Sequence, residues 1–365
     1  MKILVTEHSD HFFLLSHLDK VISPTYEVEY IFRLVRDQQY WNTIFKTKRK
    51  VSICDHSNRI FREMQFFCYI FFRGFKVNKI VVNTGPEYES ARIVFLSLLA
   101  YLPHKRKLIY TIRNPSQLSS GLENKKMNQI LRRVLVTKSR SLIFENSAAE
   151  RETLNLIPRV ANKSRCILYT YFFEDPTEPF NGIKNENQFV IGILGTINPV
   201  RRDYDIVLNC IVLLKSKGYK EVQLVFLGSC VDSSSSAIIG DFRELVTVRA
   251  LVDGWLSDET FVEWGQGCDI LLAPLKFGLK QYGSGGSTGS FGDAIRLRKR
   301  LLIPEFADPL NEFSILCDYY NDENSLYATL LDHFENPQGL ENTGEVLEKF
   351  GREKVVQSLE FLFAE

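Results

Sequence analysis

The chain has 365 residues, of which 45% are hydrophobic and 24% charged, and its formal net charge is +1. This length and composition suit two domains with cores of their own and exclude a single small module. Its most apolar stretches, residues 66–72 and 93–102, are shorter than the ~20 residues that a membrane-spanning helix needs.

The beginning of the chain and the cysteines both bear on the cellular compartment. Residues 1–8, MKILVTEH, lack the long apolar core and cleavage site of a signal peptide. The seven cysteines include no Cys-x-x-Cys pair, so neither a disulfide framework nor a zinc site is predicted. We therefore expect a cytoplasmic protein with reduced thiols, no bound metal and no nucleic-acid partner.

Charge is distributed unevenly between the two halves. Residues 1–180 contain 28 Lys and Arg against 17 Asp and Glu, a net charge of +11, whereas the remainder contains 17 against 27, a net charge of −10. The basic half suits an anionic partner such as phospholipid headgroups or a diphosphate-linked acceptor. The alternative is that the two halves attract each other.

Short β-rich runs alternate with helical patterns along the first half. Strands are predicted at residues 2–6, 79–83, 107–111, 141–145 and 164–171, and helices at 89–102 and 127–137. This alternation is typical of βα units that build a parallel sheet. The polar segment 174–188, which has two prolines and one glycine, predicts an interdomain linker.

The same alternation returns after the linker. Strands are predicted at residues 189–194, 222–227, 246–252, 269–273 and 300–304, a helix at 204–217, and an amphipathic helix over the last twenty residues. We therefore predict an α/β chain of two Rossmann-like domains, an N-terminal one at 1–178 and a C-terminal one at 189–345, followed by a terminal helix at 346–365.

A glycine-rich segment near the end of the second half is the clearest chemical signal. After the strand at 269–273, five glycines lie between residues 283 and 292, and a helix follows. Glycines let backbone N–H groups approach an anion closely, and the helix amino terminus adds partial positive charge. The segment therefore predicts a diphosphate site, although a plain linker is the alternative.

Four segments of this half resemble the nucleotide-sugar glycosyltransferases of the GT-B fold, particularly the large retaining family of bacterial polysaccharide enzymes. They are residues 189–215, 222–228, 248–274 and 286–304. The resemblance implies two Rossmann-like domains facing each other across a cleft, with the terminal helix returning to the N-terminal domain. It also implies a nucleotide-diphosphate-sugar donor on the C-terminal domain, metal-independent transfer and no separate cofactor.

Residues in these segments are candidates for the donor site. In the family's Glu-x7-Glu signature the second position, which holds the ribose hydroxyls, falls on Asp293, whereas the first falls on Gly285. The arginine after the first glycine is replaced by Thr196, and Arg201 or Arg202 matches a later basic residue. The alternative for Asp293, placed in the first turn of its helix, is to complement the helix dipole. The alternative for the arginines is an ordinary surface role.

Other donor-site candidates each have a competing structural interpretation. Trp255 lies where the family passes the nucleotide base, but a tryptophan after a glycine is also a common core anchor. The hydroxyls of Ser287, Thr288 and Ser290, with the backbone of Gly289, suit phosphate binding, and the hydroxyls also suit helix capping. The two roles are compatible.

The N-terminal half is expected to bind the acceptor and to supply any general base. Glu7, Asp10 and His11 follow the first strand, at the edge where open α/β sheets place their ligands. A metal site is the alternative for this acidic and histidine-rich cluster. Glu87 and Arg113 also follow strands and are candidates to contact the acceptor.

Residues 46–79 mix cations with aromatic side chains, which suits peripheral contact with the inner face of an anionic membrane. The alternative is a helix with an aromatic core face and a solvated basic face. Taken together, these patterns predict a glycosyltransferase that acts on a glycan or lipid-linked acceptor in polysaccharide or glycoconjugate biosynthesis. A non-catalytic GT-B subunit is one alternative, and another GT-B-like enzyme, such as a sugar epimerase or a pyruvyl transferase, is the other.

Overall fold

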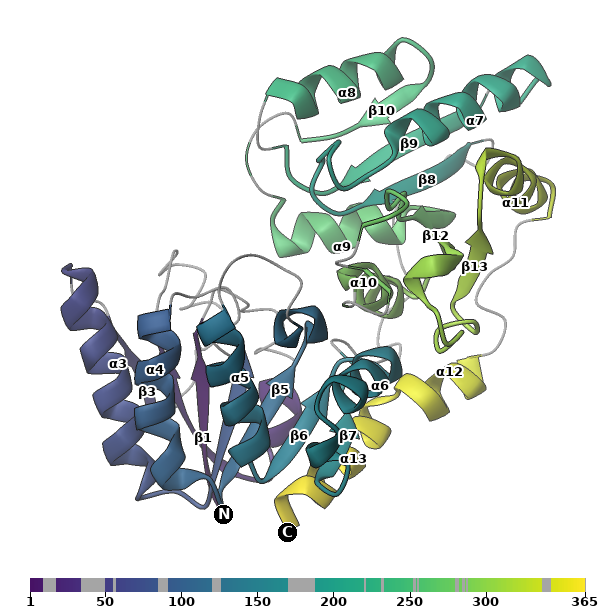
Figure 1. The fold of residues 1–365 in the computed structure, drawn as a ribbon. Coiled ribbons are helices and arrows are strands. Elements are labelled where there is room, and N and C mark those ends of the chain that lie inside the picture. The colour runs from purple at the N-terminus through teal and green to yellow at the C-terminus, as the bar shows by residue number, and fades with distance from the viewer. Residues whose placement is uncertain are drawn as a thin grey trace. The chain divides into compact units, whose positions relative to one another are not determined.

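The chain forms two compact units in the computed structural model (Figure 1). The structure describes residues 1–8, 18–33, 50–54, 57–84, 91–119, 126–169, 188–219, 221–230, 233–251, 254, 256–279, 282–283, 286, 288–336 and 343–364. Unit 1 comprises Met1–Thr170, Ser284–Ser287 and Arg352–Glu365, and unit 2 comprises Tyr171–Gly283 and Thr288–Gly351. The predicted linker lies almost wholly outside the described residues.

Unit 1 is built on a parallel sheet with the strand order β3-β2-β1-β4-β5-β6-β7. The strands are β1 Lys2–Glu7, β2 Glu27–Phe32, β3 Lys50–Ile53, β4 Lys79–Thr84, β5 Leu108–Ile112, β6 Ser141–Phe144 and β7 Ser164–Ile167. Its helices include α3 Arg59–Gly74, α4 Ala91–Tyr101, α5 Lys126–Lys138 and α6 Ser147–Leu156, with short 3-10 turns at Leu102–His104, Pro115–Leu118 and Pro158–Val160. The five strands predicted in this half are confirmed, whereas β2 and β3 were not predicted.

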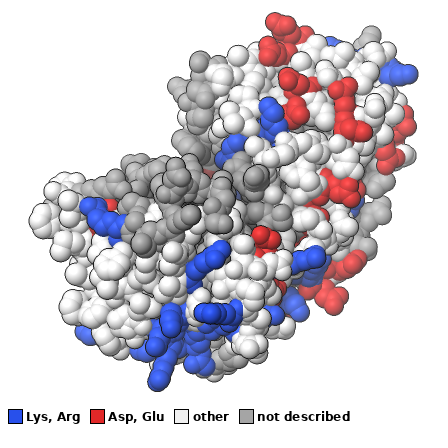
Figure 2. Space-filling model, in the orientation of Figure 1, with Lys and Arg blue, Asp and Glu red and all other residues white. Residues whose placement is uncertain are grey.

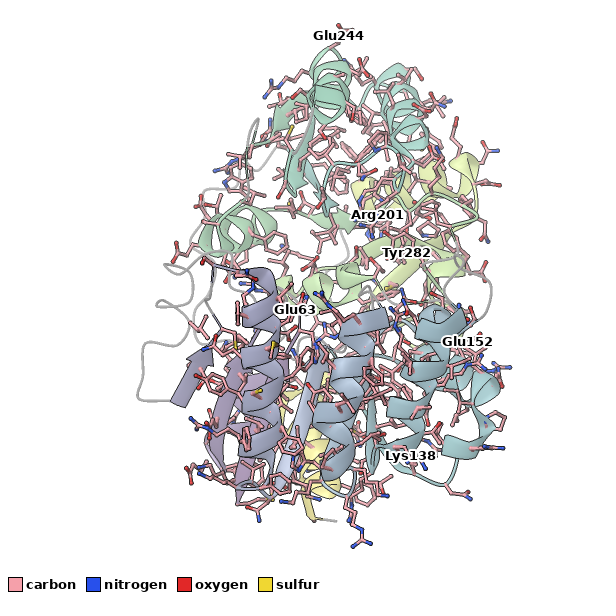
Figure 3. All side chains as sticks on the ribbon, turned by 60° about the vertical axis from the view of Figure 1, so that its left-hand side comes forward. Glu63, Lys138, Glu152, Arg201, Glu244 and Tyr282 are labelled. Carbon is pink, nitrogen blue, oxygen red and sulfur yellow. The ribbon has the colours of Figure 1, made fainter. Side chains whose placement is uncertain are left out.

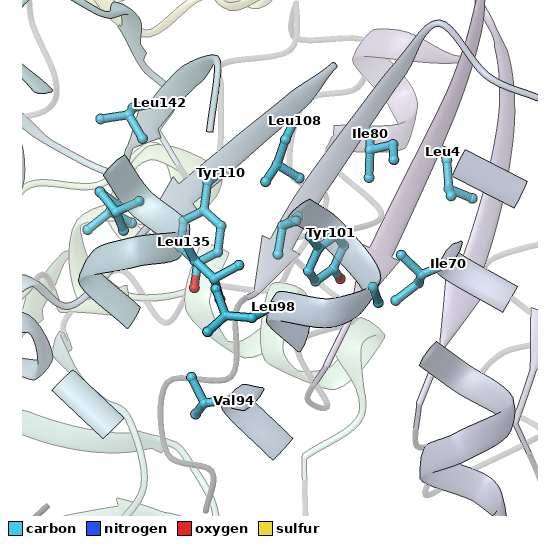
Figure 4. Close-up of a cluster of buried hydrophobic side chains, with 14 of the residues drawn as sticks. Leu4, Ile70, Ile80, Val94, Leu98, Tyr101, Leu108, Tyr110, Leu135 and Leu142 are labelled. Carbon is cyan, nitrogen blue, oxygen red and sulfur yellow. The ribbon is translucent and has the colours of Figure 1, made fainter. Parts of the chain in front are cut away.

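Helices α3, α4 and α5 cover one face of this sheet and share a core with it (Figure 4). Each strand presents alternate side chains to that face. The strands supply Leu4, Ile80, Leu108 and Leu142, and the helices supply Ile70, Leu98, Tyr101 and Leu135. Burial of such side chains stabilises the unit by roughly 1.5–3 kcal/mol each.

The end of the chain packs against unit 1 through helix α13, Arg352–Ala364. The Tyr26 and Phe363 rings meet edge to face at 5.3 Å, and Lys79 Nζ donates to the Leu362 carbonyl at 3.5 Å. The resemblance implied this return. The expected single terminal helix is in fact two, because α12, Thr343–Phe350, ends before Gly351, where a Cβ would lie 2.2 Å from a backbone oxygen.

Unit 2 is built on a second parallel sheet, in the order β10-β9-β8-β11-β12-β13. The strands are β8 Phe189–Leu194, β9 Val222–Leu227, β10 Thr247–Arg249, β11 Ile270–Leu272, β12 Leu301–Pro304 and β13 Cys317–Tyr320. Helices α7 Tyr204–Ser216, α8 Ser233–Arg243, α9 Asp258–Gln266, α10 Gly289–Leu297, α11 Glu323–Glu335 and α12 complete it, with a 3-10 turn at Glu305–Ala307. The predicted strands and α7 are confirmed, and β13 is an addition.

No helix within the described ranges is both long and apolar enough to cross a membrane.

Candidate functional site

The strand order of unit 2 marks a place for a ligand. Strand β8 lies between β9 and β11, so the chain crosses to opposite sides of β8 in its successive βα units. At such a switch point the loops after neighbouring strands diverge and leave a crevice at their carboxyl ends. The loops that follow β8 and β11 contain most of the donor-site candidates.

The loop after β8 folds tightly around one arginine. Gly195 adopts a φ of +86°, and its N–H donates to the Leu227 carbonyl at 3.0 Å. A Cβ at Gly195 would lie 2.0 Å from Nη2 of Arg202, and a Cβ at Gly228 would lie 2.0 Å from the Gly195 carbonyl oxygen. Both glycines are therefore required by close approach, and Arg202 lies directly against the turn.

A second turn places two arginines just before helix α7. The carbonyl of Asn198 accepts from the N–H groups of Arg201 at 3.1 Å and Arg202 at 3.0 Å. The side chain of Asn198 accepts from the Val200 N–H at 2.9 Å, as asparagine often does in turns. Asp203 then caps α7. The local sequence thus fixes the backbone positions from which the Arg201 and Arg202 side chains extend.

Arg202 is a buried cation with unused hydrogen-bonding capacity. It is only 8% exposed, and its backbone pairs with Leu275 in an antiparallel bridge. Its Nη1 is buried without a hydrogen-bond partner in the described part of the chain. Burial lowers the pKa of this guanidinium, but arginine remains protonated in proteins. A buried charge without a hydrogen-bonded partner is unfavourable, so this group suits an anionic ligand.

Arg201, in contrast, is exposed and held by an aromatic residue (Figure 3). Its Nε donates to the Tyr282 hydroxyl at 3.1 Å, and its guanidinium lies 5.6 Å from the centre of the Tyr282 ring. Tyr282 immediately precedes Gly283, the first glycine of the glycine-rich loop, whose φ is +71° and whose Cβ would clash with the Phe306 carbonyl. The two loops are therefore linked through this pair.

Asp293 brings a carboxylate near Arg202. The pKa of Asp293 is raised to about 7, mainly by burial. The charges of Arg296 and Arg202 oppose this rise, and the charge of Asp258 adds to it. Helix α10 begins at Gly289, so Asp293 is its fifth residue and the prediction that it lies in the first turn is wrong. Because the helix dipole acts within the first turn, dipole compensation does not explain this carboxylate.

The start of α10 fulfils the predicted capping role. Thr288 is the N-cap, its hydroxyl accepts from the Ser290 N–H at 3.3 Å, and the two hydroxyl groups lie 3.1 Å apart. Gly289 is exposed, and a Cβ there would meet nothing within 4 Å. Thr196 is half-buried in the loop after β8. Trp255, Ser287 and Gly285 lie outside the described residues.

A polar row follows the carboxyl ends of four neighbouring strands in unit 1. Asn83 Nδ2 donates to Glu7 Oε2 at 2.6 Å. Arg113 donates to the side-chain and backbone oxygens of Asn83, both at 3.3 Å, and pairs with Glu145 at 3.3 Å. Burial raises the pKa of Glu145 and Arg113 lowers it. Glu7 is 1% exposed, so it is enclosed in this network.

His8 is a buried histidine next to this row. Its Nε2 lies 2.8 Å from the Tyr101 hydroxyl, which lies 2.8 Å from the Thr6 hydroxyl. Its Nδ1 is buried without a hydrogen-bond partner in the described ranges. Burial, and then the charge of Arg33, hold the pKa of His8 well below its usual value, so the ring is neutral near pH 7.

The remaining candidates of the N-terminal half, Asp10, His11 and Glu87, lie outside the described residues. Among those described, no group of three or more His, Cys, Asp or Glu could hold a metal ion. Sequence reasoning missed Tyr282, Asn83 and Glu145. Each had a usable signal, because Tyr282 precedes the first glycine of the loop, and the other two were assigned to the carboxyl ends of predicted strands.

The fold can now be compared with known proteins. Neither a protein-family model nor a curated protein matches the sequence. Among solved structures, HepE of Anabaena in complex with UDP and glucose is 11% identical, with 100% of both chains covered and a TM-score of 0.71.

Two other solved structures are similar at comparable identity. A UDP-GlcNAc 2-epimerase of Neisseria meningitidis bound to UDP-GlcNAc is 14% identical over 99% of this chain and 100% of that chain, with a TM-score of 0.63. The N-terminal domain of a Candida albicans trehalose-6-phosphate phosphatase is 10% identical over 100% and 96%, with a TM-score of 0.62. The chain has the GT-B fold that the resemblance implied.

Proposed function

We propose that this protein is a glycosyltransferase that binds a nucleotide-diphosphate sugar on unit 2 and transfers the sugar to a glycan or lipid-linked acceptor. The observation that carries the proposal is the buried Nη1 of Arg202, which lacks a hydrogen-bond partner in the described part of unit 2. A diphosphate oxygen supplies the missing acceptor and neutralises the buried charge. The solved complexes of HepE with UDP and UDP-glucose support this ligand class.

Each donor-site residue then has a distinct task. Arg202 binds the diphosphate from the floor of the loop after β8, and Arg201, oriented by Tyr282, binds it from the exposed side. The amino end of α10, with Thr288, Gly289 and Ser290, adds backbone dipoles, to which Ser287 contributes a hydroxyl. Both arginines also stabilise the charge that grows on the leaving diphosphate as the glycosidic bond breaks.

The nucleoside is recognised separately from the phosphates. We propose that Asp293 accepts hydrogen bonds from the ribose hydroxyls, which favours its ionised form, and that Thr196 and Trp255 line the path toward the sugar and the base. Because ionised Asp293 is the stronger acceptor, ribose binding releases a proton near pH 7.

The acceptor belongs to unit 1 in this proposal. The segment with Glu7, Asp10 and His11 supplies the general base, and Glu87 and Arg113 contact the acceptor. Since Glu7 is enclosed in the network with Asn83 and Arg113, we assign it the task of holding its neighbours in position, which leaves proton transfer to Asp10 or His11. Transfer takes place on the cytoplasmic side, with peripheral attachment to the membrane.

A thermal-shift series tests donor binding, because a ligand of the native state raises the unfolding midpoint. We expect uridine diphosphate to raise it, with guanosine, cytidine and thymidine diphosphates as comparisons and adenosine monophosphate as a negative control. No shift with any diphosphate contradicts the site. Release of nucleoside diphosphate, measured with a panel of nucleotide sugars and acceptors, then tests transfer.

The second candidate is epimerisation, favoured by the likeness to UDP-GlcNAc 2-epimerases. Nuclear magnetic resonance of a UDP-GlcNAc incubation without acceptor separates the two. A transferase leaves the sugar stereochemistry intact until an acceptor is added, whereas an epimerase inverts the carbon at position two. Nucleotide binding with neither reaction supports a non-catalytic subunit.

A further inference from the structure

Three helices on one face of unit 1 expose large apolar side chains to solvent. Eight large apolar residues each have a relative accessible surface between 51% and 64%: Ile60, Phe61, Met64, Phe72, Phe75, Phe95, Leu99 and Ile130. All lie on α3, α4 or α5 except Phe75, which directly follows α3. We call this set, with Cys68, the apolar face. Scattered exposed apolar residues are ordinary, but a contiguous group marks an interaction surface.

The spacing within the helices shows why these residues point outward. Met64, Cys68 and Phe72 recur every four positions along α3, and Phe95 and Leu99 do so along α4. Residues four apart lie on the same side of a helix. The opposite side of α3, with Phe66, Phe67 and Ile70, is buried against the sheet. Helix α3 is thus apolar on two sides, and folding uses only one.

The charges of these helices have one sign. Across their sequences, α3, α4 and α5 contain one carboxylate, Glu63, against several Lys and Arg. Glu63 is buried and pairs with Arg92 at 2.5 Å, so it adds no negative charge to the surface. A protein partner of mixed charge needs acidic groups here as well as basic ones, and the described face offers none.

Exposed cations border the apolar face at one end. Lys76 follows Phe75, and Lys105 and Arg106 follow the turn of His104, whose ring lies 4.6 Å from the Phe75 ring. Lys and Arg also gather at one end of unit 1 in Figure 2, and Figure 3 turns the side of α3 and α4 forward. Apolar side chains bordered by cations match the interface of an anionic bilayer.

We propose that the apolar face is a docking surface for an anionic lipid bilayer. The aromatic and aliphatic side chains insert at the level of the headgroups, and the bordering cations lie against lipid phosphates. Each cation near such a surface strengthens binding about fivefold at low salt. This inference rests on the peripheral attachment named in the proposed function and deepens it by identifying the surface that makes the contact. Neither the nucleotide site nor the reaction enters the argument, so the two can fail separately.

The docking surface differs from the segment that the sequence suggested. Residues 50–53 are strand β3, and Lys79 is buried in β4 and bonded to Leu362. Residues 46–49 lie outside the described ranges. Helices α4 and α5, which the sequence did not implicate, contribute apolar residues instead. The aromatic side chains of α3 serve both the core, as the alternative predicted, and the outward face.

Cys68 provides a native reporter at the centre of this surface. It is the exposed cysteine of the seven, and the others are buried apart from half-buried Cys166. In a Cys166→Ser background, Cys68 is labelled with an environment-sensitive nitrobenzoxadiazole dye. We expect its emission to rise and shift to the blue with phosphatidylcholine vesicles that contain 30% phosphatidylglycerol (about a third anionic lipid), to stay unchanged with phosphatidylcholine alone, and to revert in high salt.

Two variants test the apolar and charged parts separately by vesicle co-sedimentation. Phe72→Glu is expected to weaken binding to anionic vesicles at least about tenfold. Lys105→Glu with Arg106→Glu is expected to do so by a similar factor, with a flatter salt dependence. Val212→Glu, at an exposed apolar residue of α7 in unit 2, is the matched control and should bind like the parent.

Circular dichroism checks that the variants fold, and the thermal shift with uridine diphosphate should be the same in all of them. A failed lipid test with an intact nucleotide response refutes only this inference. The inference is overturned if anionic and neutral vesicles bind equally, if Phe72→Glu binds like Val212→Glu, or if the dye is buried without lipid in a concentration-dependent dimer.

Discussion

Two arginines at the carboxyl ends of strands, Arg113 in unit 1 and Arg202 in unit 2, differ in how the fold uses their charge. In unit 1, Arg113 is paired with Glu145 and hydrogen-bonded to Asn83, so its guanidinium is used within the fold. In unit 2, Arg202 is more deeply buried, yet its Nη1 has no hydrogen-bond partner among the described residues. Asp293 influences Arg202 only through its charge.

This difference separates a structural charge from one that is available for a ligand. Folding has to offset the desolvation of every buried charge, and it does so for Arg113 with a carboxylate and two amide oxygens. For Arg202 part of the desolvation cost is not offset, because Nη1 has no hydrogen-bond partner among the described residues. A native protein retains such an unfavourable group mainly where it functions, so Arg202 is a better candidate for anion binding than Arg113.

The largest expected effect comes from replacing each arginine by methionine. Arg202→Met should weaken uridine diphosphate binding by about 100-fold, because charge-assisted hydrogen bonds to the phosphates are lost. It should leave the free energy of unfolding unchanged or higher, because a buried, incompletely paired charge is removed. Arg113→Met should instead lower that free energy by about 3 kcal/mol, because Glu145, whose side chain is only 15% exposed, loses its partner.

Calorimetric titration and urea unfolding of both variants provide the measurements. The comparison is wrong if Arg202→Met destabilises the protein as much as Arg113→Met does while binding nucleotide normally.

A second pair of variants compares two carboxylates of unit 2, Asp293 and Asp318. The pKa of Asp293 is raised to about 7 by burial, so the folded state binds a proton that the unfolded state loses near pH 4. Stability therefore falls as pH rises from about 4 to 7. Asp293→Asn should raise the free energy of unfolding at pH 8 by about 1–2 kcal/mol, after allowance for partial exposure of the carboxylate. The unfolding midpoint should rise with it, and nucleotide binding should weaken.

Asp318 is the matched control, because it is a carboxylate with partners. Burial opposes its ionisation, but hydrogen bonds from His333 and Arg300 hold its pKa below the usual value. Its contribution is present above the unfolded pKa and lost as pH falls. Asp318→Asn should therefore lower the midpoint at pH 8. Equal shifts of the same sign in both variants would argue against the assignment of Asp293.

A third prediction concerns the opposite pH response of unit 1. The pKa of His8 is held well below 6.5, so below that pH the unfolded chain binds a proton that the folded one does not. Stability should then fall with acidification, with a slope approaching about 1.4 kcal/mol per pH unit. His8→Gln should flatten the slope between pH 6.5 and 5 in urea unfolding followed by a probe of unit 1. An unchanged slope shows that another group controls acid sensitivity.

The smallest effects come from two helix caps. Thr288 caps α10, and Asn146 caps α6 by accepting from the Ala149 N–H at 2.7 Å. Replacement by alanine should destabilise either variant by about 1 kcal/mol. Only Thr288→Ala should also weaken uridine diphosphate binding, by about threefold, because its helix start lies at the site. If both variants bind nucleotide normally, Thr288 is only a cap.

Local patterns explain which strands were predicted and which were not. The predicted strands are apolar runs, such as Phe189–Leu194, bounded by turn residues. Strand β2 carries Glu29, whose carboxylate is buried and pairs with Arg73 and Lys2. Strand β13 carries Asp318, which Arg300 and His333 satisfy. A charged residue in a strand interrupts the apolar pattern that predicts strands. The partner that neutralises the charge is distant in sequence, so neighbouring residues do not identify it.

The sequence by itself determined the alternation of strands and helices, the glycine turns, and the position of Arg201 and Arg202 in the loop after a strand, whereas Asp293 was identified through the family resemblance. These features depend on preferences that act over a few neighbouring positions. Only the tertiary structure decided which charges remain available. Glu7 meets Asn83 across 76 positions of sequence, whereas Arg202 lies against Gly195 and keeps a nitrogen without a hydrogen bond among the described residues. Pairing of buried charges depends on which strands become neighbours in the sheet, and that is set by the packing of the whole unit.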